Sequence, residues 1–160
     1  MNYYTRTGDQ MTTSVITKRV YKNHPLVECL GTIDELQSHL MLCTHYVDEK
    51  KQDLLKNLAA SFFSYSADLI GVGSCRMTED NVLALEKSVD EISQTLPKQQ
   101  GFLLPGTTLA NAQIHIARTV ARRLERTLVT YARKKTIPAV LLKYINRVSD
   151  LLYVLARSVE

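Results

Sequence analysis

The stretch Ala117-Arg118-Thr119-Val120-Ala121-Arg122-Arg123-Leu124-Glu125-Arg126 joins the apolar pattern of a buried helix to a high density of arginine. At 3.6 residues per turn, one face of this helix is apolar and comprises Ala117, Val120, Ala121, Leu124 and Leu128. Arg118, Arg122 and Glu125 form a polar stripe beside it. Arginines four residues apart offer forked donors that suit phosphate or carboxylate, and Glu125 is placed to orient Arg122. The stripe is therefore a candidate anion site, although a solvated face with ordinary charge pairs has the same pattern.

Apolar residues recur at helical spacing on both sides of this stretch and predict five helices in total. Their expected spans are Pro25 to about Tyr46, about Glu49 to Ile70, Thr78 to Leu96, about Thr108 to Arg133, and Pro138 through Arg157. Because no strand period or internal repeat is visible, we predict an all-α, up-and-down five-helix bundle. Residues 1–160 are expected to form one domain, with 25–160 as the bundle and 1–24 as an ordered loop arm.

The composition excludes several classes of protein. With 45% hydrophobic and 22% charged residues, the 160-residue chain suits a globular domain with a real core. No apolar run resembles a signal peptide or a membrane span, so a cytoplasmic location and no membrane partner are expected. The three cysteines share no CxxC spacing, which favours reduced thiols. A net charge of +4 favours anionic partners but lacks the concentrated basic runs of most nucleic-acid binders.

The arm from Tyr4 to Ser14 has the composition of a phosphate cradle. Its glycine, Gly8, allows close approach of the backbone, and Arg6 adds a positive charge. Hydroxyl donors are supplied by Thr5, Thr7, Thr12 and Thr13. The patterns GxxxxGK[ST] and GxGxxG are absent, so any nucleotide site here is neither a P-loop nor a Rossmann site. A disordered polar tail is the alternative interpretation.

Two other features have possible chemistry. His39 and Cys43 share a helical face, but no second pair of ligands appears, so no metal site is predicted. Asp34 is a carboxylate in an apolar turn, and we expect it to lie on the inward side of its helix with an arginine partner, Arg118 being the leading candidate. The connector 101–106 contains a Phe and two Leu, which must pack or line a site.

Six blocks of the sequence together resemble the PduO-type ATP:cob(I)alamin adenosyltransferases, in the order and spacing of that family and along nearly the whole chain. The blocks are Thr5-Arg6-Thr7-Gly8-Asp9 with Thr12-Thr13, Arg19-Val20 before Lys22, Val27-Glu28 ahead of Gly31-Thr32-Ile33-Asp34-Glu35-Leu36, Phe102-Leu103-Leu104-Pro105-Gly106, Ala117-Arg118-Thr119 with Arg122-Arg123-Leu124-Glu125-Arg126, and Asn146-Arg147-Val148-Ser149-Asp150 with Leu155-Ala156-Arg157.

The resemblance implies a homotrimer of ferritin-like five-helix bundles that binds ATP at each subunit interface, between the arm of one subunit and the helices of another. It assigns the nucleotide site to Thr5, Arg6, Thr7, Gly8, Asp9, Thr12, Thr13, Lys22, Arg122, Glu125 and Asn146. It implies that Asp34 pairs with Arg118 across the interface, and that these two act in catalysis with Arg122 and Glu125. Phe102 is implied to stand against the lower face of the corrin and keep the dimethylbenzimidazole base off cobalt.

The implied reaction is attack of cobalt(I) on the 5′ carbon of ATP, with triphosphate leaving together with Mg. Such a reaction needs positioning and electrostatic stabilisation more than acid or base catalysis. A flavoprotein reductase is a compatible partner. The family usually has other residues at Met11, Thr107 and Gln37, and a glycine-bearing turn at Ile16-Thr17-Lys18; we nevertheless expect the arm to bind ATP. The alternatives are a non-catalytic relative that binds a nucleotide or corrinoid, and a helical interaction or nucleic-acid-binding module.

Overall fold

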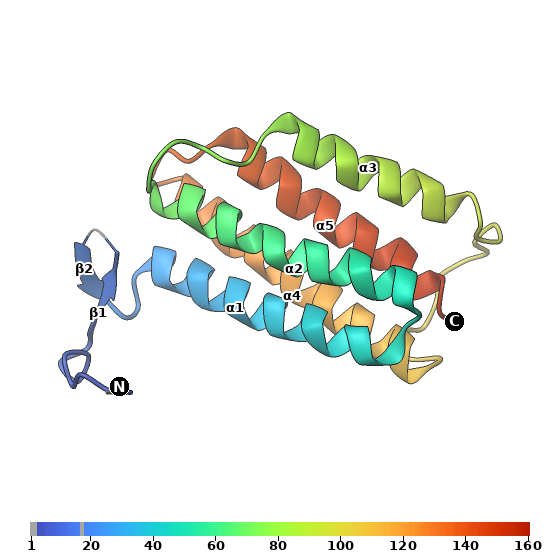
Figure 1. The fold of residues 1–160 in the computed structure, drawn as a ribbon, viewed down its shortest axis with the longest axis horizontal. Helices are drawn as coiled ribbons and strands as arrows, with labels where there is room; N and C mark the ends of the chain where they lie inside the picture. The colour runs from blue at the N-terminus through green and yellow to red at the C-terminus, as the bar shows by residue number, and fades with distance from the viewer. Residues whose placement is uncertain (1–2, 17) are drawn as a thin grey trace.

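The computed structural model describes residues 3–16 and 18–160. Its elements are the strands β1 (Thr12–Val15) and β2 (Lys18–Tyr21), the helices α1 (Pro25–Cys43), α2 (Glu49–Ile70), α3 (Glu79–Ser93), α4 (Leu109–Ala132) and α5 (Ala139–Arg157), and a short 3₁₀ turn, Thr44–Tyr46, after α1 (Figure 1). The predicted five-helix bundle is confirmed, and each helix ends within a few residues of its expected limit.

Local sequence signals set the helix limits. The Asp48 carboxylate accepts a hydrogen bond from the Lys51 amide at 3.1 Å and caps α2. Gly71 ends the same helix with a φ of 81°, a left-handed conformation that suits glycine. Thr108 caps α4 by accepting from the Asn111 amide at 3.0 Å. These caps satisfy amide and carbonyl groups that have no partner inside the helix.

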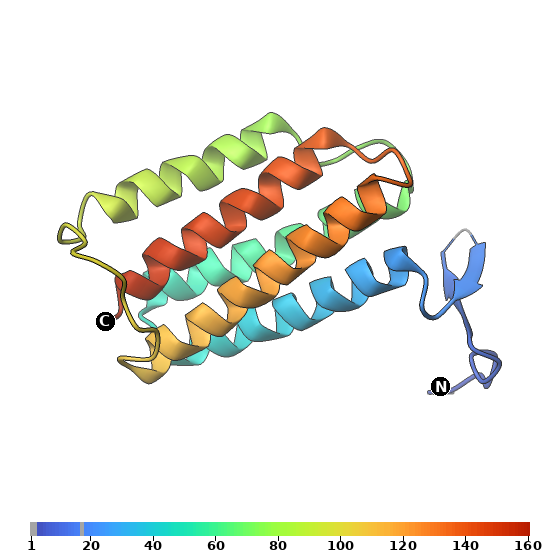
Figure 2. The same ribbon diagram turned by 180° about the vertical axis from the view of Figure 1, so that it is seen from behind.

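Helix α4 lies between α1 and α5, with α2 packed on α1 and α3 packed on α5 (Figures 1 and 2). The apolar stripe of α4 predicted from the sequence is buried at every one of its positions: Ala117, Val120, Ala121, Leu124 and Leu128. Two polar contacts fix the core between α2 and α5, because Tyr65 Oη donates to the Leu141 carbonyl at 3.0 Å and the Ser61 and Tyr144 hydroxyls lie 2.7 Å apart. In residues 3–16 and 18–160, no helix is both long and apolar enough to span a membrane.

The arm contains an antiparallel β-hairpin, so the expectation of a loop throughout residues 1–24 was wrong. Thr12 pairs with Tyr21 and Val15 pairs with Lys18, and the hairpin lies beyond the first turn of α1 (Figure 1). Strands of four residues are too short to show a clear alternation in the sequence. Ile16, directly after β1, has a φ of 36°, and Thr17 lies outside the described residues.

The loop after α2 is organised by Asp68, whose side chain is fully buried. Its carboxylate accepts hydrogen bonds from the Arg76 amide at 2.8 Å, from the Met77 amide at 2.7 Å and from the Cys75 thiol at 3.3 Å. This one side chain therefore satisfies the amides that bring the chain from α2 to α3.

Replacing this carboxylate should destabilise the fold. Asp68→Ala leaves the buried Met77 amide and the partly buried Arg76 amide without this acceptor, and we expect it to lower the free energy of unfolding by about 2 kcal/mol. Urea unfolding followed by circular dichroism would measure the change. Asp53→Ala, on the exposed side of the same helix, is the matched control and should shift stability by no more than about 0.5 kcal/mol. Equal stabilities of the two variants would contradict this role of Asp68.

Candidate active site

A chain of four side chains links α3, α5 and α4. Asn146 Nδ2 donates to Glu125 Oε1 at 3.0 Å, and Arg147 Nη1 donates to Asn146 Oδ1 at 2.8 Å. The Arg147 Nε group also donates to Glu86 Oε1 at 2.7 Å. With both ends of its amide engaged, Asn146 is held in one orientation, and Glu125 is fixed beside it.

The sequence did not reveal this support for the predicted nucleotide residues. It placed Arg147 in a family-like block without assigning it a role, and nothing in the sequence distinguished Glu86. These two residues are 61 positions apart, so only the packing of α3 on α5 brings them together. The Glu86 carboxylate holds the pKa of Arg147 above its ordinary value, which keeps this guanidinium charged.

Arg122 lies exposed on α4 and has no hydrogen bond or ion pair with any described residue. The expected contact between Glu125 and Arg122 is not formed, because the Glu125 carboxylate faces Asn146 instead. Neighbouring Arg123 is different, since it forms an ion pair with Glu35 of α1. Among the described residues, Arg122 is therefore an unpaired forked cation, one helical turn from the ordered Glu125 carboxylate.

Arg118 is half-buried and is held by two aromatic rings. Its Nε group donates to His115 Nδ1 at 3.1 Å, and its guanidinium carbon lies 5.9 Å from the ring centre of Tyr153. Burial, followed by the Arg118 charge, lowers the pKa of His115. The histidine is therefore neutral near pH 7, and its Nδ1 can accept the hydrogen bond.

Asp34 does not lie on the inward side of its helix, which corrects that expectation. The buried stripe of α1 comprises Leu26, Cys29, Ile33, Leu36, Leu40 and Cys43. Asp34 follows Ile33 by one residue, a turn of 100° away from the stripe, and is exposed. It borders a groove between α1 and α2 with Met41 and Phe63. Within one chain, no ion pair between described residues joins Asp34 to Arg118.

The arm brings together several residues predicted to hold phosphate. Arg19 donates to the Thr7 carbonyl, and its Nη2 lies 2.8 Å from Thr12 Oγ1, so the segment before β1 is folded back on the hairpin. A Cβ atom placed on Gly8 would lie 3.5 Å from Lys22 Nζ, which shows how closely the lysine approaches this glycine. Arg19 belongs to one of the family-like blocks, but no sequence pattern indicated that it organises the arm.

Thr5, Arg6, Thr7 and Asp9 are exposed on the arm, and Thr13 is half-buried. The Thr5 and Thr7 hydroxyls are 2.8 Å apart, and the Arg6 guanidinium lies 5.4 Å from the ring centre of Tyr4. Asp9 and Thr13 lie on either side of Met11 along the chain, where the Met11 carbonyl accepts from the Lys22 amide at 2.9 Å. Met11 has a φ of 60°, a left-handed conformation that costs a residue with a Cβ atom roughly 1 to 2 kcal/mol.

The arm and the helical cluster do not meet within one chain. In the part of the chain that the structure describes, no hydrogen bond or ion pair connects residues 5–22 to Arg122, Glu125 or Asn146. Both views show the hairpin beyond the end of α1, away from the middle of α4 and α5 (Figures 1 and 2). One chain thus presents two separate halves of the predicted nucleotide site.

Phe102 lies in the connector between α3 and α4 and is entirely exposed, at 106% of the reference area. Leu104 is 86% exposed, so neither side chain packs on its own bundle. Leu103, between them, is 39% exposed. A binding role for Phe102 stays a prediction.

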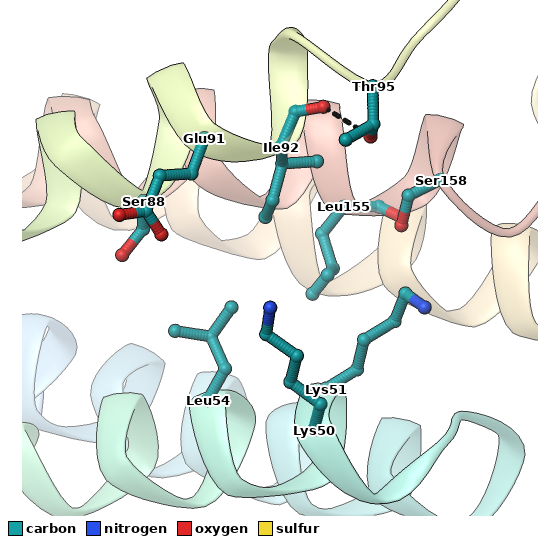
Figure 3. Close-up of a pocket in the computed structure, with 9 residues that line it drawn as sticks. All are labelled: Lys50, Lys51, Leu54, Ser88, Glu91, Ile92, Thr95, Leu155 and Ser158. Atoms are coloured by element: carbon teal, nitrogen blue, oxygen red, sulfur yellow. Dashed lines mark hydrogen bonds between the residues drawn. The ribbon is translucent and has the colours of Figure 1, made fainter.

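A separate groove of about 330 Å³ lies between α2 and α3 and contains none of the predicted site residues. Leu54 from α2 and Ile92 from α3 point into it, with Leu155 of α5 at its floor and Lys50 and Lys51 at the rim (Figure 3).

Known proteins are similar to this chain over nearly its whole length. The sequence profile described as Cobalamin adenosyltransferase matches residues 3–159. The corrinoid adenosyltransferase PduO of Salmonella typhimurium is 41% identical over 99% of this chain and 49% of that protein, and PduO of Citrobacter freundii is 40% identical over 99% and 50%. The chain therefore spans about half the length of these two relatives. The corrinoid adenosyltransferase of Bacillus subtilis is 32% identical over 100% of this chain and 87% of that protein.

Solved structures of corrinoid adenosyltransferases also match the fold of this chain. The PduO-type ATP:corrinoid adenosyltransferase of Lactobacillus reuteri was solved as a phenylalanine-to-alanine variant complexed with cobalamin and ATP. It matches with a TM-score of 0.92 and 30% identity, over 99% of this chain and 93% of that one. An arginine-to-lysine variant complexed with ATP matches with a TM-score of 0.90 and 32% identity, over 96% of this chain and 91% of that one. From its arm to the end of α5, the chain belongs to the cobalamin adenosyltransferase family.

Proposed function

We propose that the protein transfers the 5′-deoxyadenosyl group of ATP to the cobalt of cob(I)alamin and releases triphosphate. The observation that carries this proposal is the position of Arg122, which has no partner among the described residues and lies three residues before Glu125 on α4, whose carboxylate is held by Asn146. Family membership supports it, as do the relatives, which are named corrinoid adenosyltransferases. Both ATP and cobalamin are bound in a similar solved structure.

The residues suit a displacement that needs little proton transfer. Cobalt(I) is the nucleophile, the bond between the 5′ carbon and its oxygen breaks, and triphosphate leaves with the electron pair and with the Mg²⁺ that accompanies ATP. Arg122 and Lys22 would stabilise the charge that grows on the leaving group. Thr12 and the backbone near Gly8 would add neutral donors. Glu125 and Asn146 would orient the nucleotide by hydrogen bonds, so that the 5′ carbon faces cobalt.

We further propose that a second copy of the chain completes the site in a homotrimer. The arm of one subunit would then meet the α4 and α5 residues of its neighbour, which joins the two halves that a single chain keeps apart. Exposure of Asp34 on α1 and of Phe63 on α2, at 74%, leaves a surface that a neighbouring subunit could cover. Within this assembly we place residues 1–24, as the arm, and 25–160, as the bundle, in one domain. A cytoplasmic location with a flavoprotein reductase as electron donor fits the need for cobalt(I).

An anaerobic assay tests the activity directly. The protein is mixed with MgATP and chemically reduced cobalamin, and formation of adenosylcobalamin is followed by its absorption spectrum. We expect product that depends on both substrates. Binding of ATP without product would instead support a non-catalytic relative. Displacement of ATP by duplex DNA, but not by excess triphosphate, would support a nucleic-acid-binding module.

The arm should work with methionine at position 11. Met11→Gly removes the strain of a positive φ but also frees the unfolded arm, and these effects oppose each other. We therefore expect the Kd for MgATP to change by less than about tenfold, or 1.4 kcal/mol, in calorimetry. Gln10→Gly is the matched control without a left-handed residue. A larger change would show that Met11 sets the course of the arm.

Saturating MgATP should slow trypsin cleavage after Arg6. Equal cleavage rates with and without MgATP would argue against a phosphate cradle in the arm.

A further inference from the structure

The segment between α3 and α4 from Pro97 to Thr108, called the connector from here on, carries Phe102. It is attached at both ends to α5 and the residues directly after it. At the first end, Tyr153 Oη donates to Gln99 Oε1 at 2.7 Å and Arg157 Nη2 donates to the Pro97 carbonyl at 2.9 Å. At the second end, Thr108 Oγ1 donates to the carbonyl of Val159, just after α5, at 2.8 Å. The connector is therefore a loop with two fixed ends and an exposed apex.

The contact with Tyr153 reaches almost to Phe102. Gln99 accepts from the tyrosine through its amide oxygen, and its Nε2 group donates to the Gly101 carbonyl at 2.7 Å. Gly101 directly precedes Phe102 and has a φ of 79°, so the turn that points the aromatic ring outward is held by the same glutamine. A half-turn of the Gln99 amide would break the contact with Gly101, because it would bring Oε1 against that carbonyl oxygen.

The same tyrosine contacts the arginine of the predicted interface pair. The Arg118 guanidinium carbon lies 5.9 Å from the ring centre of Tyr153, and the His115 ring centre lies 6.1 Å from it. Arg118 in turn is held by its hydrogen bond to His115. Tyr153 thus has one side of its ring on Arg118 and its hydroxyl on the connector.

We propose that Tyr153 and Gln99 are positioning residues that fix Phe102 relative to Arg118 and thereby set how the corrinoid lies over the nucleotide. This inference rests on the proposed function. Because α5 is packed against both α3 and α4, it gives the two contacts a rigid base. The structure assigns the outward aim of Phe102 to this side-chain link, since neither Phe102 nor Leu104 is held by packing on the bundle.

The test uses two variants that each remove one partner of the same hydrogen bond. Tyr153→Phe keeps the ring against Arg118 and removes only the hydroxyl, whereas Gln99→Leu keeps most of the side-chain volume. Lys143→Met is the matched control, because Lys143 also joins α5 to the α3 side through an exposed contact, an ion pair with Glu79 at 2.7 Å.

Hydrogen exchange of residues 100–104 is measured on the full, ligand-free protein. The same protein preparations are then used to measure KM for cob(I)alamin, KM for MgATP, and the fraction of bound cobalt(II) that has no lower axial ligand. Both test variants should speed exchange in the connector, raise KM for cob(I)alamin about three- to tenfold, the range expected for one lost hydrogen bond, and lower the fraction without a lower ligand. KM for MgATP should stay within about twofold, and the double variant should be no worse than Gln99→Leu alone, which already removes both contacts of the glutamine. Lys143→Met should change none of these quantities.

The outcomes separate the inference from the proposed function. A wild type that forms no adenosylcobalamin would overturn the proposed function, and with it the role in placing the corrinoid. An active wild type whose variants keep the wild-type KM and cobalt(II) spectrum would overturn the inference alone, even if exchange in the connector rises. Unchanged exchange, or additive effects in the double variant, would also overturn it.

Discussion

Arg122→Ala is expected to lower kcat for adenosyl transfer by about two orders of magnitude, a loss typical of a donor that stabilises charge in the transition state. The arginine has no partner among the described residues and lies exposed on α4. Its removal should therefore leave the free energy of unfolding within about 0.5 kcal/mol of wild type. Anaerobic steady-state kinetics with saturating MgATP would measure the change in kcat, and urea unfolding would measure stability.

Two further variants make this test specific. Arg122→Lys keeps the charge but loses the forked donors, so its kcat should fall between those of the wild type and Arg122→Ala. Arg133→Ala, at the exposed end of α4, removes an arginine charge outside the proposed site and should leave kcat unchanged. Near wild-type turnover by Arg122→Ala, with ATP still bound, would remove the arginine from the mechanism.

Asp34→Ala and Arg118→Ala are each expected to cost about 3 to 5 kcal/mol in the free energy of assembly of the proposed trimer, the usual result of leaving one charge of a buried pair without its partner. In a single chain Asp34 is exposed and Arg118 is half-buried against Tyr153, so only contact between subunits can join them. The double variant should be little worse than either single variant. Sedimentation equilibrium, together with turnover at several protein concentrations, would supply the double-mutant cycle.

The chain contains a matched control for this cycle. Glu35 and Arg123 form an ion pair within one subunit, with side chains 43% and 46% exposed, and α1 carries Glu35 beside Asp34. Exposed pairs contribute at most about 1 kcal/mol, so Glu35→Ala should leave assembly nearly unchanged. Additive effects of the Asp34 and Arg118 substitutions, or equal effects from Glu35→Ala, would refute the interface pair.

The helices were predictable from the sequence because their signals are local. Apolar periodicity gave the buried stripe of α4, while Gly71, Pro97 and Pro138 marked limits that the structure places within a few residues. The hairpin was missed because its strands have only four residues each. Asp34 was expected to face inward because its neighbours are apolar, but a step of 100° per residue carries it off the stripe.

The site was harder to predict from the sequence, because its supporting contacts join residues that are far apart in the chain. Family resemblance brought Glu125 and Asn146 together, and the structure places their side chains 3.0 Å apart. No local pattern indicated the roles of Glu86, Arg19 or Gln99, because each acts through a partner on another segment. Such partners are set by how helices pack and how the arm folds, which one-dimensional periodicity does not describe.

The separation of arm and helical cluster within one chain has a genetic consequence in the proposed trimer. A subunit with a defective arm damages only the site where that arm would dock, and it still offers an intact α4 and α5 to its other neighbour. A subunit with a defective α4 damages only the site on its own helices, and its intact arm can still complete the site of a neighbour. Two inactive alleles, one altered at Lys22 and the other at Arg122, should therefore complement each other when expressed together, whereas two alleles altered in the same half should not.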